Sequence, residues 1–244
     1  MQTTSLDEQT APQKIIITGA SSGIGFETAI ELAINGHEVI ALSRSAEKLA
    51  NLQQIIHSLN PEAIIYPIVF DIVNDDYSSL SQFIQQKWGK FNVLINNAGV
   101  LINKPFMETS AKDFVEMFES NLLGHIQIIQ NLFPLMETQG HIVNIGSMGG
   151  YHGSSKFEGL SAYSASKAAL HNLTECLAQE FLPHNIKVNC LALGSAQTEM
   201  LEKAFPDYKS PVMAYEMGQY IANFALNGHK FHNGKILPVA GIGI

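Results

Sequence analysis

Cysteine and positive charge are both scarce in this chain of 244 residues. It holds two cysteines, Cys176 and Cys190, whose spacing suits neither a metal site nor a disulfide framework, so free thiols in a reducing compartment are expected. Lysine and arginine number 14 against 22 acidic residues, for a formal net charge of -8, and no basic run occurs. This balance argues against binding to nucleic acid or to an anionic membrane.

Long hydrophobic runs and metal-ligand clusters are missing as well. No apolar run approaches the roughly 20 residues of a membrane-spanning helix. Residues 1–13 are polar and lack the apolar stretch of a signal peptide. The nine histidines are scattered and form no ligand cluster. We therefore expect a cytoplasmic protein without a resident metal, beginning with a flexible polar segment over residues 1–13.

The chain does have a hydrophobic content of 46%, arranged as short apolar strands that alternate with amphipathic helices. The pattern predicts strands over residues 14–18, 37–42, 64–70, 92–95, 141–145, 187–191 and 235–238. It predicts helices over residues 24–35, 46–58, 76–87, 113–132, 161–182 and 212–226. Such alternation indicates an α/β fold, a single Rossmann-type doubly wound domain over residues 14–244 with a mostly parallel seven-stranded sheet flanked by helices. Ligands of such sheets bind outside the carboxyl ends of the strands.

The first strand ends in a glycine-rich loop, residues 18–25 with the sequence TGASSGIG, that runs straight into a helix. Gly19, Gly23 and Gly25 allow a tight turn and a close approach of the backbone to a pyrophosphate. The helix N-terminus offers unpaired N–H groups to the same anion. An ordinary glycine-rich turn is the alternative, but the strand-loop-helix setting favours a dinucleotide.

Tyr163 and Lys167 stand four residues apart in an alanine-rich stretch, so on a helix they project from one face. A neighbouring ammonium favours the phenolate, and we expect Lys167 to lower the pKa of Tyr163 toward the working range of an acid-base group. Taken alone, such a pair is more typical of a solvated helix face. Its meaning depends on the rest of the chain.

Together with the glycine-rich loop, this pair resembles the short-chain dehydrogenase/reductase family, in its standard subgroup of about this length. The resemblance extends almost end to end. Residues 96–99 are similar to the family's N-N-A-G motif, Asn121 to its helix asparagine, and Ser147 to its catalytic serine. Residues 193–198, LGSAQT, resemble its P-G-x-x-x-T motif, with Leu193 in place of the proline.

The resemblance implies a catalytic set of Asn121, Ser147, Tyr163 and Lys167. Tyr163 would exchange a proton with the carbonyl or hydroxyl oxygen while hydride passes to or from the nicotinamide. Ser147 would hydrogen-bond the same oxygen as charge develops on it. Lys167 would also hold the nicotinamide ribose, and Asn121 would hold a helix kink and a proton-relay water.

The resemblance also assigns a dinucleotide site. Its residues would be Gly19, Ser21, Ser22, Gly23, Ile24, Gly25, Ser43, Arg44, Asp71, Ile72, Asn97, Ala98, Gly99, Tyr163, Lys167, Gly194, Ala196 and Thr198. NAD-preferring relatives carry an acidic residue at the end of the second strand, where this chain has Ser43 followed by Arg44. Because a guanidinium pairs well with a 2′-phosphate, NADP(H) is favoured, with NAD(H) as the alternative.

Three departures from the family pattern bear on the site. Leu193 replaces a proline, so the loop that follows it loses a fixed φ angle and is expected to be more mobile. Residues 148–162 form a longer segment that should wall the substrate pocket. Its aromatic residues favour an apolar or ring-bearing substrate, although a plain surface loop would carry them as well. Residues 199–210 form a short substrate lid, which predicts an open mouth.

The sequence therefore predicts an NADP(H)-dependent oxidoreductase that interconverts a carbonyl and a secondary alcohol of a small molecule. In relatives, helix faces build a homodimer or homotetramer, and we expect one here. The alternatives are a dinucleotide-binding regulatory protein without turnover, an epimerase or dehydratase of the same family, and a structural assembly module. The residues fix neither the substrate nor the physiological direction.

Overall fold

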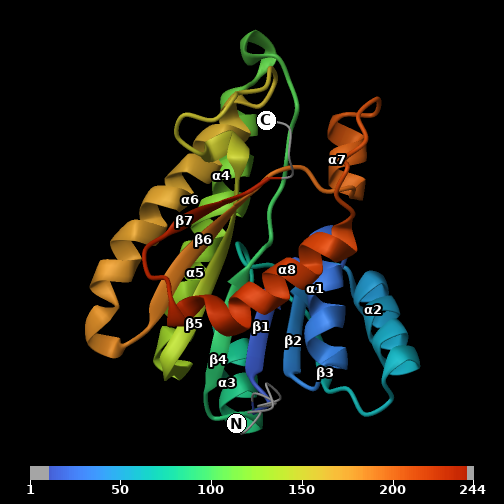
Figure 1. The fold of residues 1–244 in the computed structure, drawn as a ribbon, viewed down its shortest axis with the longest axis vertical. Helices are drawn as coiled ribbons and strands as arrows, with labels where there is room; N and C mark the ends of the chain where they lie inside the picture. The colour runs from blue at the N-terminus through green and yellow to red at the C-terminus, as the bar shows by residue number, and fades with distance from the viewer. Residues whose placement is uncertain (1–10, 241–244) are drawn as a thin grey trace, which may run out of the picture.

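Seven strands form one sheet in the computed structural model, which describes residues 11–240. Their order across the sheet is β3-β2-β1-β4-β5-β6-β7, and all pairings are parallel (Figure 1). The strands are β1 Lys14–Thr18, β2 Glu38–Ser43, β3 Ile65–Val69, β4 Phe91–Asn96, β5 Met136–Ser147, β6 Lys187–Leu193 and β7 Ile236–Val239.

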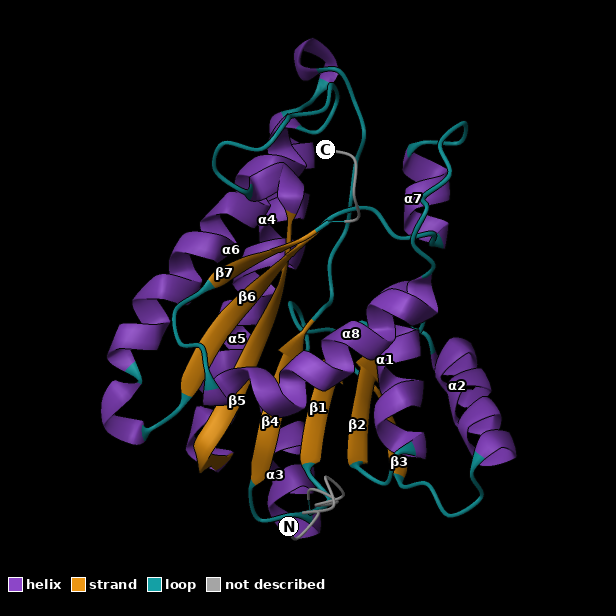
Figure 2. Ribbon diagram, viewed as in Figure 1, coloured by secondary structure: helices purple, strands orange, loops and turns teal. Residues whose placement is uncertain are grey.

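Helices cover both faces of this sheet (Figure 2). They are α1 Gly23–Ile34, α2 Ala46–Leu59, α3 Tyr77–Lys87, α4 Ala111–Phe118, α5 Gly124–Leu132, α6 Ser161–Glu180, α7 Glu199–Ala204 and α8 Ala214–Asn227. Ile15 and Ile17 of β1 belong to a core shared with α1, α2 and α8, whereas Ile16 belongs to a core shared with α3, α5 and α6. The alternation follows from the two-residue period of a strand, and it buries both faces.

The connections reverse direction at β1. The chain moves outward from β1 to β2 and β3, then crosses to β4 on the other side of β1 and continues to β7. Connections that leave neighbouring parallel strands in opposite directions open a crevice at the carboxyl ends of those strands. The glycine-rich loop after β1 and the Asn97–Gly99 segment after β4 therefore meet at one point.

The predicted fold class is confirmed, with all seven strands parallel. The predicted helix over residues 113–132 is present, with one irregularity. Residues 113–132 form α4 and α5 with a π-helical segment, Glu119–Leu123, between them. A π segment inserts one extra residue into a helix, and here it turns the buried Asn121 amide toward the backbone of Val100. The short helix α7 in the lid was not predicted.

Both predicted free thiols are found, with Cys176 exposed and Cys190 buried. No helix among residues 11–240 is long and apolar enough to cross a membrane. The predicted flexible segment over residues 1–13 lies almost entirely outside the described residues.

Candidate active site

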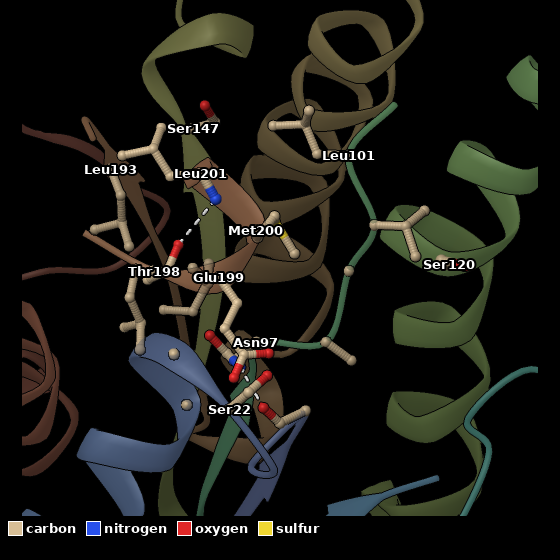
Figure 3. A pocket seen from close by; sticks show the side chains of 18 of the residues that line it. Ser22, Asn97, Leu101, Ser120, Ser147, Leu193, Thr198, Glu199, Met200 and Leu201 are labelled. Atoms are coloured by element: carbon tan, nitrogen blue, oxygen red, sulfur yellow. Dashed lines mark hydrogen bonds between the residues drawn. The ribbon is translucent and has the colours of Figure 1, made fainter. Parts of the chain in front are cut away.

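One cavity of about 860 Å³ lies at the carboxyl ends of the strands, within the range of roughly 300–1,000 Å³ typical of ligand pockets. All residues predicted to bind the dinucleotide line it, and so do Ser147 and the lid. Figure 3 shows Ser22, Asn97, Ser147 and Thr198 converging on it from separate segments. The sequence motifs thus come together in space as predicted.

The glycine-rich loop is packed directly against the segment after β4. Asn97 donates from Nδ2 to the carbonyls of Thr18 (3.0 Å) and Gly19 (3.1 Å). Gly19 has φ +67°, and a Cβ there would lie 2.8 Å from Ala98 Cα; a Cβ on Gly25 would overlap the Asn97 amide. Glycine is therefore required at both positions, because a side chain would push the two segments apart.

The start of α1 is open toward the cavity. Its N-cap residue, Ser22, makes no side-chain cap hydrogen bond, and the first turn carries no acidic residue. Ser21, Ser22, Gly23 and Ile24 all line the cavity. First-turn N–H groups and the positive end of the helix dipole are thus available to an anion.

The cavity extends past Ser43 and Arg44 at the end of β2. Asp71, on the neighbouring strand end, accepts hydrogen bonds from Val73 N (2.9 Å) and Asn74 Nδ2 (3.2 Å). Burial raises the pKa of Asp71, but these hydrogen bonds and the charge of Arg44 outweigh it, so the pKa lies below its usual value. Asp71 is a carboxylate at neutral pH.

An ion pair that the sequence did not suggest spans this end of the cavity. Lys48 Nζ lies 2.8 Å from Glu199 Oε2, and both residues line the cavity. Lys48 belongs to α2 and Glu199 is the first residue of α7. Thr198 caps the same helix, since its hydroxyl accepts from Leu201 N at 3.2 Å (Figure 3).

Tyr163, Ser147 and Lys167 all line the cavity. Burial raises the pKa of Tyr163, while a hydrogen bond with Ser147 lowers it, and the net result is a raised value. The predicted lowering of this pKa by Lys167 was therefore wrong for the structure described. The Lys167 Nζ lies 6.0 Å from the centre of the Tyr163 ring and donates to the Ile145 carbonyl at 2.8 Å. Burial lowers its own pKa to about 8.

Asn121 lies behind the cavity rather than in its lining. Its Oδ1 accepts from Val100 N at 2.8 Å, and its Nδ2 donates to the Val100 carbonyl and the Ser166 hydroxyl, each at 3.0 Å. The side chain is fully buried. Asn121 thus joins the loop after β4 to α6, the helix that carries Tyr163, and the expected helix irregularity is present.

His171 is the residue that sequence reasoning missed. Its Nε2 accepts from Ser147 N at 3.4 Å, and the ring lies near the Gly150 carbonyl. Burial, and then the charge of Lys167, lower its pKa to about 4, so the imidazole is neutral. Its spacing in the sequence could have identified it. His171 follows Lys167 by four residues, as Lys167 follows Tyr163, so on a helix all three lie on one face.

Residues 13–209 match the family model described as short chain dehydrogenase. A 3-oxoacyl-(acyl-carrier-protein) reductase of Thermotoga maritima is 34% identical over 239 residues, which cover 93% of this chain and 95% of the relative. An NADPH-dependent pterin aldehyde reductase of Arabidopsis thaliana is 33% identical over 198 residues, covering 80% and 79%. A crystal structure of a short chain dehydrogenase from Shigella flexneri complexed with NADP has a TM-score of 0.83 at 25% identity, covering 93% and 96%.

The fold and the site define a nucleotide-binding oxidoreductase, and the chain belongs to the short-chain dehydrogenase/reductase family.

Proposed function

We propose that this protein is an NADP(H)-dependent oxidoreductase that interconverts a carbonyl and a secondary alcohol of a small molecule, with Tyr163 as the acid-base group. One observation carries the proposal: Ser147 and Tyr163 line the same cavity as the glycine-rich loop. A reacting oxygen placed there would meet two hydroxyl groups beside a bound dinucleotide.

The residues present fit a dinucleotide. Gly19 and Gly25 leave backbone where a side chain would fill the space, and the N–H groups at the start of α1 are free to bind a pyrophosphate. The cavity runs from this loop to Arg44 in one direction and to Tyr163 in the other. One extended molecule can therefore reach both ends.

Arg44 supports a preference for the 2′-phosphate. It is the only arginine in the sequence, it is exposed at the cavity, and no ion pair holds it within residues 11–240. No carboxylate stands at Ser43 to accept from ribose hydroxyls. The NADPH dependence printed for the Arabidopsis relative and the NADP in the Shigella structure agree with this preference.

The bound dinucleotide would supply or accept the hydride at the carbonyl carbon. Because burial raises its pKa, Tyr163 is a neutral phenol and can donate its proton to the carbonyl oxygen during reduction. Ser147 would donate a hydrogen bond to that oxygen as negative charge builds on it. Lys167, held by the Ile145 carbonyl, would place a positive charge behind the phenol. In the oxidation direction Tyr163 would take the proton back.

Replacing Tyr163 with Phe tests the acid-base assignment. We expect the turnover number for carbonyl reduction to fall by about 100- to 10,000-fold, the usual contribution of a positioned acid, while NADPH binding stays within about threefold. Tyr220→Phe, on the exposed side of α8, is the matched control. Stopped-flow NADPH oxidation and fluorescence titration give the two readouts. Comparable activity in Tyr163→Phe would contradict the proposal.

Replacing Arg44 with Ala tests the cofactor preference. The loss of a charged hydrogen bond, worth about 1.5–3 kcal/mol, should weaken NADPH binding by roughly 10- to 100-fold and change NADH binding much less. Lys90→Ala, an exposed lysine away from the cavity, controls for net charge. A wild-type protein that binds NADH more tightly than NADPH would show that Ser43 and Arg44 had been misinterpreted.

A homodimer or homotetramer and a cytoplasmic location stay predictions. Light scattering on the purified protein and fractionation of cells would test them.

A further inference from the structure

Beyond Ser147 and Tyr163 the cavity is enclosed by three segments: the loop after β4, the loop between β5 and α6, and the lid that contains α7. The side chains that these segments contribute are largely apolar. They include Leu101, Met148, Phe157, Met200, Phe205 and Tyr208. This part of the cavity, which we call the substrate chamber, is therefore walled by hydrocarbon, sulfur and ring atoms.

Three of these side chains are exposed although they are large and apolar. Phe157 is 57% exposed, Met200 44% and Tyr208 46%. They come from different segments and converge on one cavity, unlike the single exposed apolar residues that are scattered over any protein surface. An apolar ligand would remove their surfaces from water, which is favourable in proportion to the area covered.

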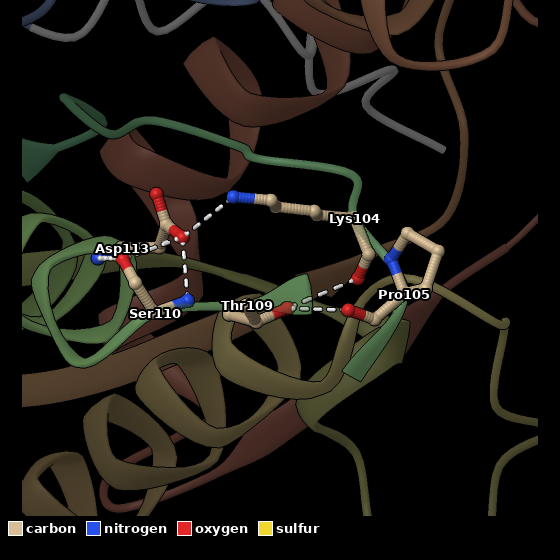
Figure 4. Close-up of polar contacts among 5 residues, drawn as sticks. All are labelled: Lys104, Pro105, Thr109, Ser110 and Asp113. Carbon is tan, nitrogen blue, oxygen red and sulfur yellow. Dashed lines mark hydrogen bonds and ion pairs between the residues drawn. The ribbon is translucent and has the colours of Figure 1, made fainter. Parts of the chain in front are cut away.

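Two lysines beside the chamber already have partners. Lys104 pairs with Asp113 at 3.2 Å, and Thr109 donates to the Lys104 and Pro105 carbonyls (Figure 4). Lys156 donates to the carbonyls of Gly149 (2.9 Å) and Tyr151 (2.6 Å).

Glu199 and the Tyr208 hydroxyl, which belong to the lid, have partners as well. Glu199 is held by Lys48, and the Ser195 hydroxyl lies 3.0 Å from the Tyr208 hydroxyl. Among the lining residues, the only other ionisable charges are Arg44 and Asp71 at the adenosine end and Lys167 at the catalytic centre. Among the described residues that line the chamber beyond Ser147 and Tyr163, no cation is therefore left to pair with a phosphate or carboxylate.

The chamber walls are fastened to one another. Asn103 Nδ2 donates to the Ala204 carbonyl at 2.7 Å, which ties the loop after β4 to the end of α7. Lys104 N donates to the Gly159 carbonyl at 2.9 Å, which ties the same loop to the segment before α6. The apolar lining is thus a built surface in which three segments hold each other in place.

From these observations we propose that the substrate is an uncharged carbonyl compound, or the corresponding alcohol, whose reacting carbon carries a bulky apolar group. This inference rests on the proposed function and adds the substrate class to it. A carboxylate or phosphate buried in the chamber would lose its hydration without gaining a partner, which disfavours binding strongly.

Matched pairs of ketones test the substrate class. Each pair consists of a methyl ketone that ends in a free carboxylate and the methyl ester of the same acid, with linear, cyclohexyl and aryl spacers. The Tyr163→Phe variant saturated with NADPH serves for calorimetric binding, so that binding is measured without turnover. We expect the esters to bind about 100-fold more tightly than the acids. Equal or tighter binding of the acids, or no binding of any ester at 10 mM, would overturn the proposal.

The wild-type enzyme separates this proposal from the proposed function. If the esters bind and are not reduced, the oxidoreductase assignment fails, and only the preference of the chamber for uncharged apolar ligands stands. If the acids are reduced in preference to the esters, the oxidoreductase assignment stands and the substrate class fails. Met200→Lys adds an ammonium to the chamber and should shift the preference toward the acids by at least about tenfold. Leu59→Lys, an exposed leucine at the end of α2 outside the cavity, is the matched control and should not shift it.

A second inference is carried independently by His171. The Ser147 hydroxyl projects from a short turn that lies against this imidazole, which accepts from Ser147 N and lies near the Gly150 carbonyl. The ring also passes under Gly146, where a Cβ would overlap Nε2. We infer that His171 is a positioning residue that holds the turn so that the Ser147 hydroxyl faces the reacting oxygen.

Non-additivity tests this role. His171→Leu should lower the turnover number by about 10- to 100-fold while NADPH affinity changes by less than about threefold, and His171→Gln, which keeps an acceptor, should recover part of the loss. In a Ser147→Ala background, His171→Leu should lower the turnover number by less than about threefold, because the hydroxyl that His171 positions has been removed. Equal losses in both backgrounds, or full turnover in His171→Leu, would overturn the inference.

Discussion

At the scale of single residues, burial governs the acid-base properties of the site. It raises the pKa of Tyr163 and lowers the pKa of Lys167 to about 8, each toward the uncharged form. A neutral phenol is the form that donates a proton to a carbonyl, so the raised pKa suits reduction. Within residues 11–240, the Lys167 ammonium donates a hydrogen bond only to the Ile145 carbonyl.

The lowered pKa of Lys167 predicts that kcat/KM declines at alkaline pH. The folded pKa is lowered from 10.5 to about 8, so the ammonium is present below pH 8 and is lost as the pH rises through 8. If this charge supports dinucleotide binding and the reaction, kcat/KM for NADPH should fall about tenfold per pH unit above 8, since kcat/KM reports groups of the free enzyme. Initial rates from pH 6 to 10 measure it. The Lys167→Met variant should have a lower kcat/KM over the whole pH range and should not show the decline above pH 8. A wild-type kcat/KM that stays constant up to pH 10 would contradict the assignment.

At the scale of elements, the π-helical segment between α4 and α5 positions the site. It turns Asn121 inward to satisfy both polar backbone groups of Val100 and to reach α6. Three parts of the site, the loop after β4, the α4–α5 unit and α6, therefore share one buried amide.

Removing that amide should destabilise the protein. Asn121→Ala leaves buried backbone groups without partners, at a cost of about 1–3 kcal/mol for each group. Urea unfolding should show a loss of at least about 2 kcal/mol in the free energy of unfolding. Asn131→Ala on the exposed face of α5 is the matched control, expected to stay within about 0.5 kcal/mol. Equal stability of the two variants would show that the Asn121 contacts contribute little.

The sequence predicted most helices and strands but not these details. Some of the elements are too short to give a pattern, and some of the contacts join residues that are far apart in the sequence. The residues of α4 and α5 continue one apolar pattern, and a single extra residue shifts that pattern too little to be visible. Helix α7 has 6 residues, fewer than two turns, so it shows no periodicity. The bond between Ser147 and His171 joins residues 24 apart, and that between Lys48 and Glu199 joins residues 151 apart, so only the fold reveals them.

At the scale of the whole molecule, buried histidines make stability depend on pH. Burial lowers the pKa of His125 and of His141 to about 3, and each side chain is almost fully inaccessible. Both are neutral in the folded protein, whereas the unfolded chain takes up protons near pH 6.5. The unfolded state therefore binds more protons below pH 6.5, and stability falls as the pH falls from there toward 3.

Because of these histidines, the free energy of unfolding should decrease measurably when the pH is lowered. Between pH 7 and pH 5 each of the two histidines should remove about 2 kcal/mol from the free energy of unfolding, at 1.36 kcal/mol per pKa unit. Urea unfolding followed through the fluorescence of the single tryptophan, Trp88, measures it. His57→Ala, at an exposed position on α2, should show the same loss as the wild type. Unchanged stability at pH 5 would show that these side chains ionise without unfolding.

The Lys48–Glu199 ion pair has a consequence for the order in which ligands bind. Glu199 and Met200 are consecutive residues of α7. Glu199 pairs with Lys48 of α2, and Met200 lines the substrate chamber. Any molecule that competes for Lys48 therefore acts on the helix that shapes the second binding site. If a dinucleotide engages Lys48, we expect it to bind before the substrate, and product-inhibition patterns should then show competitive inhibition between the two dinucleotide forms alone.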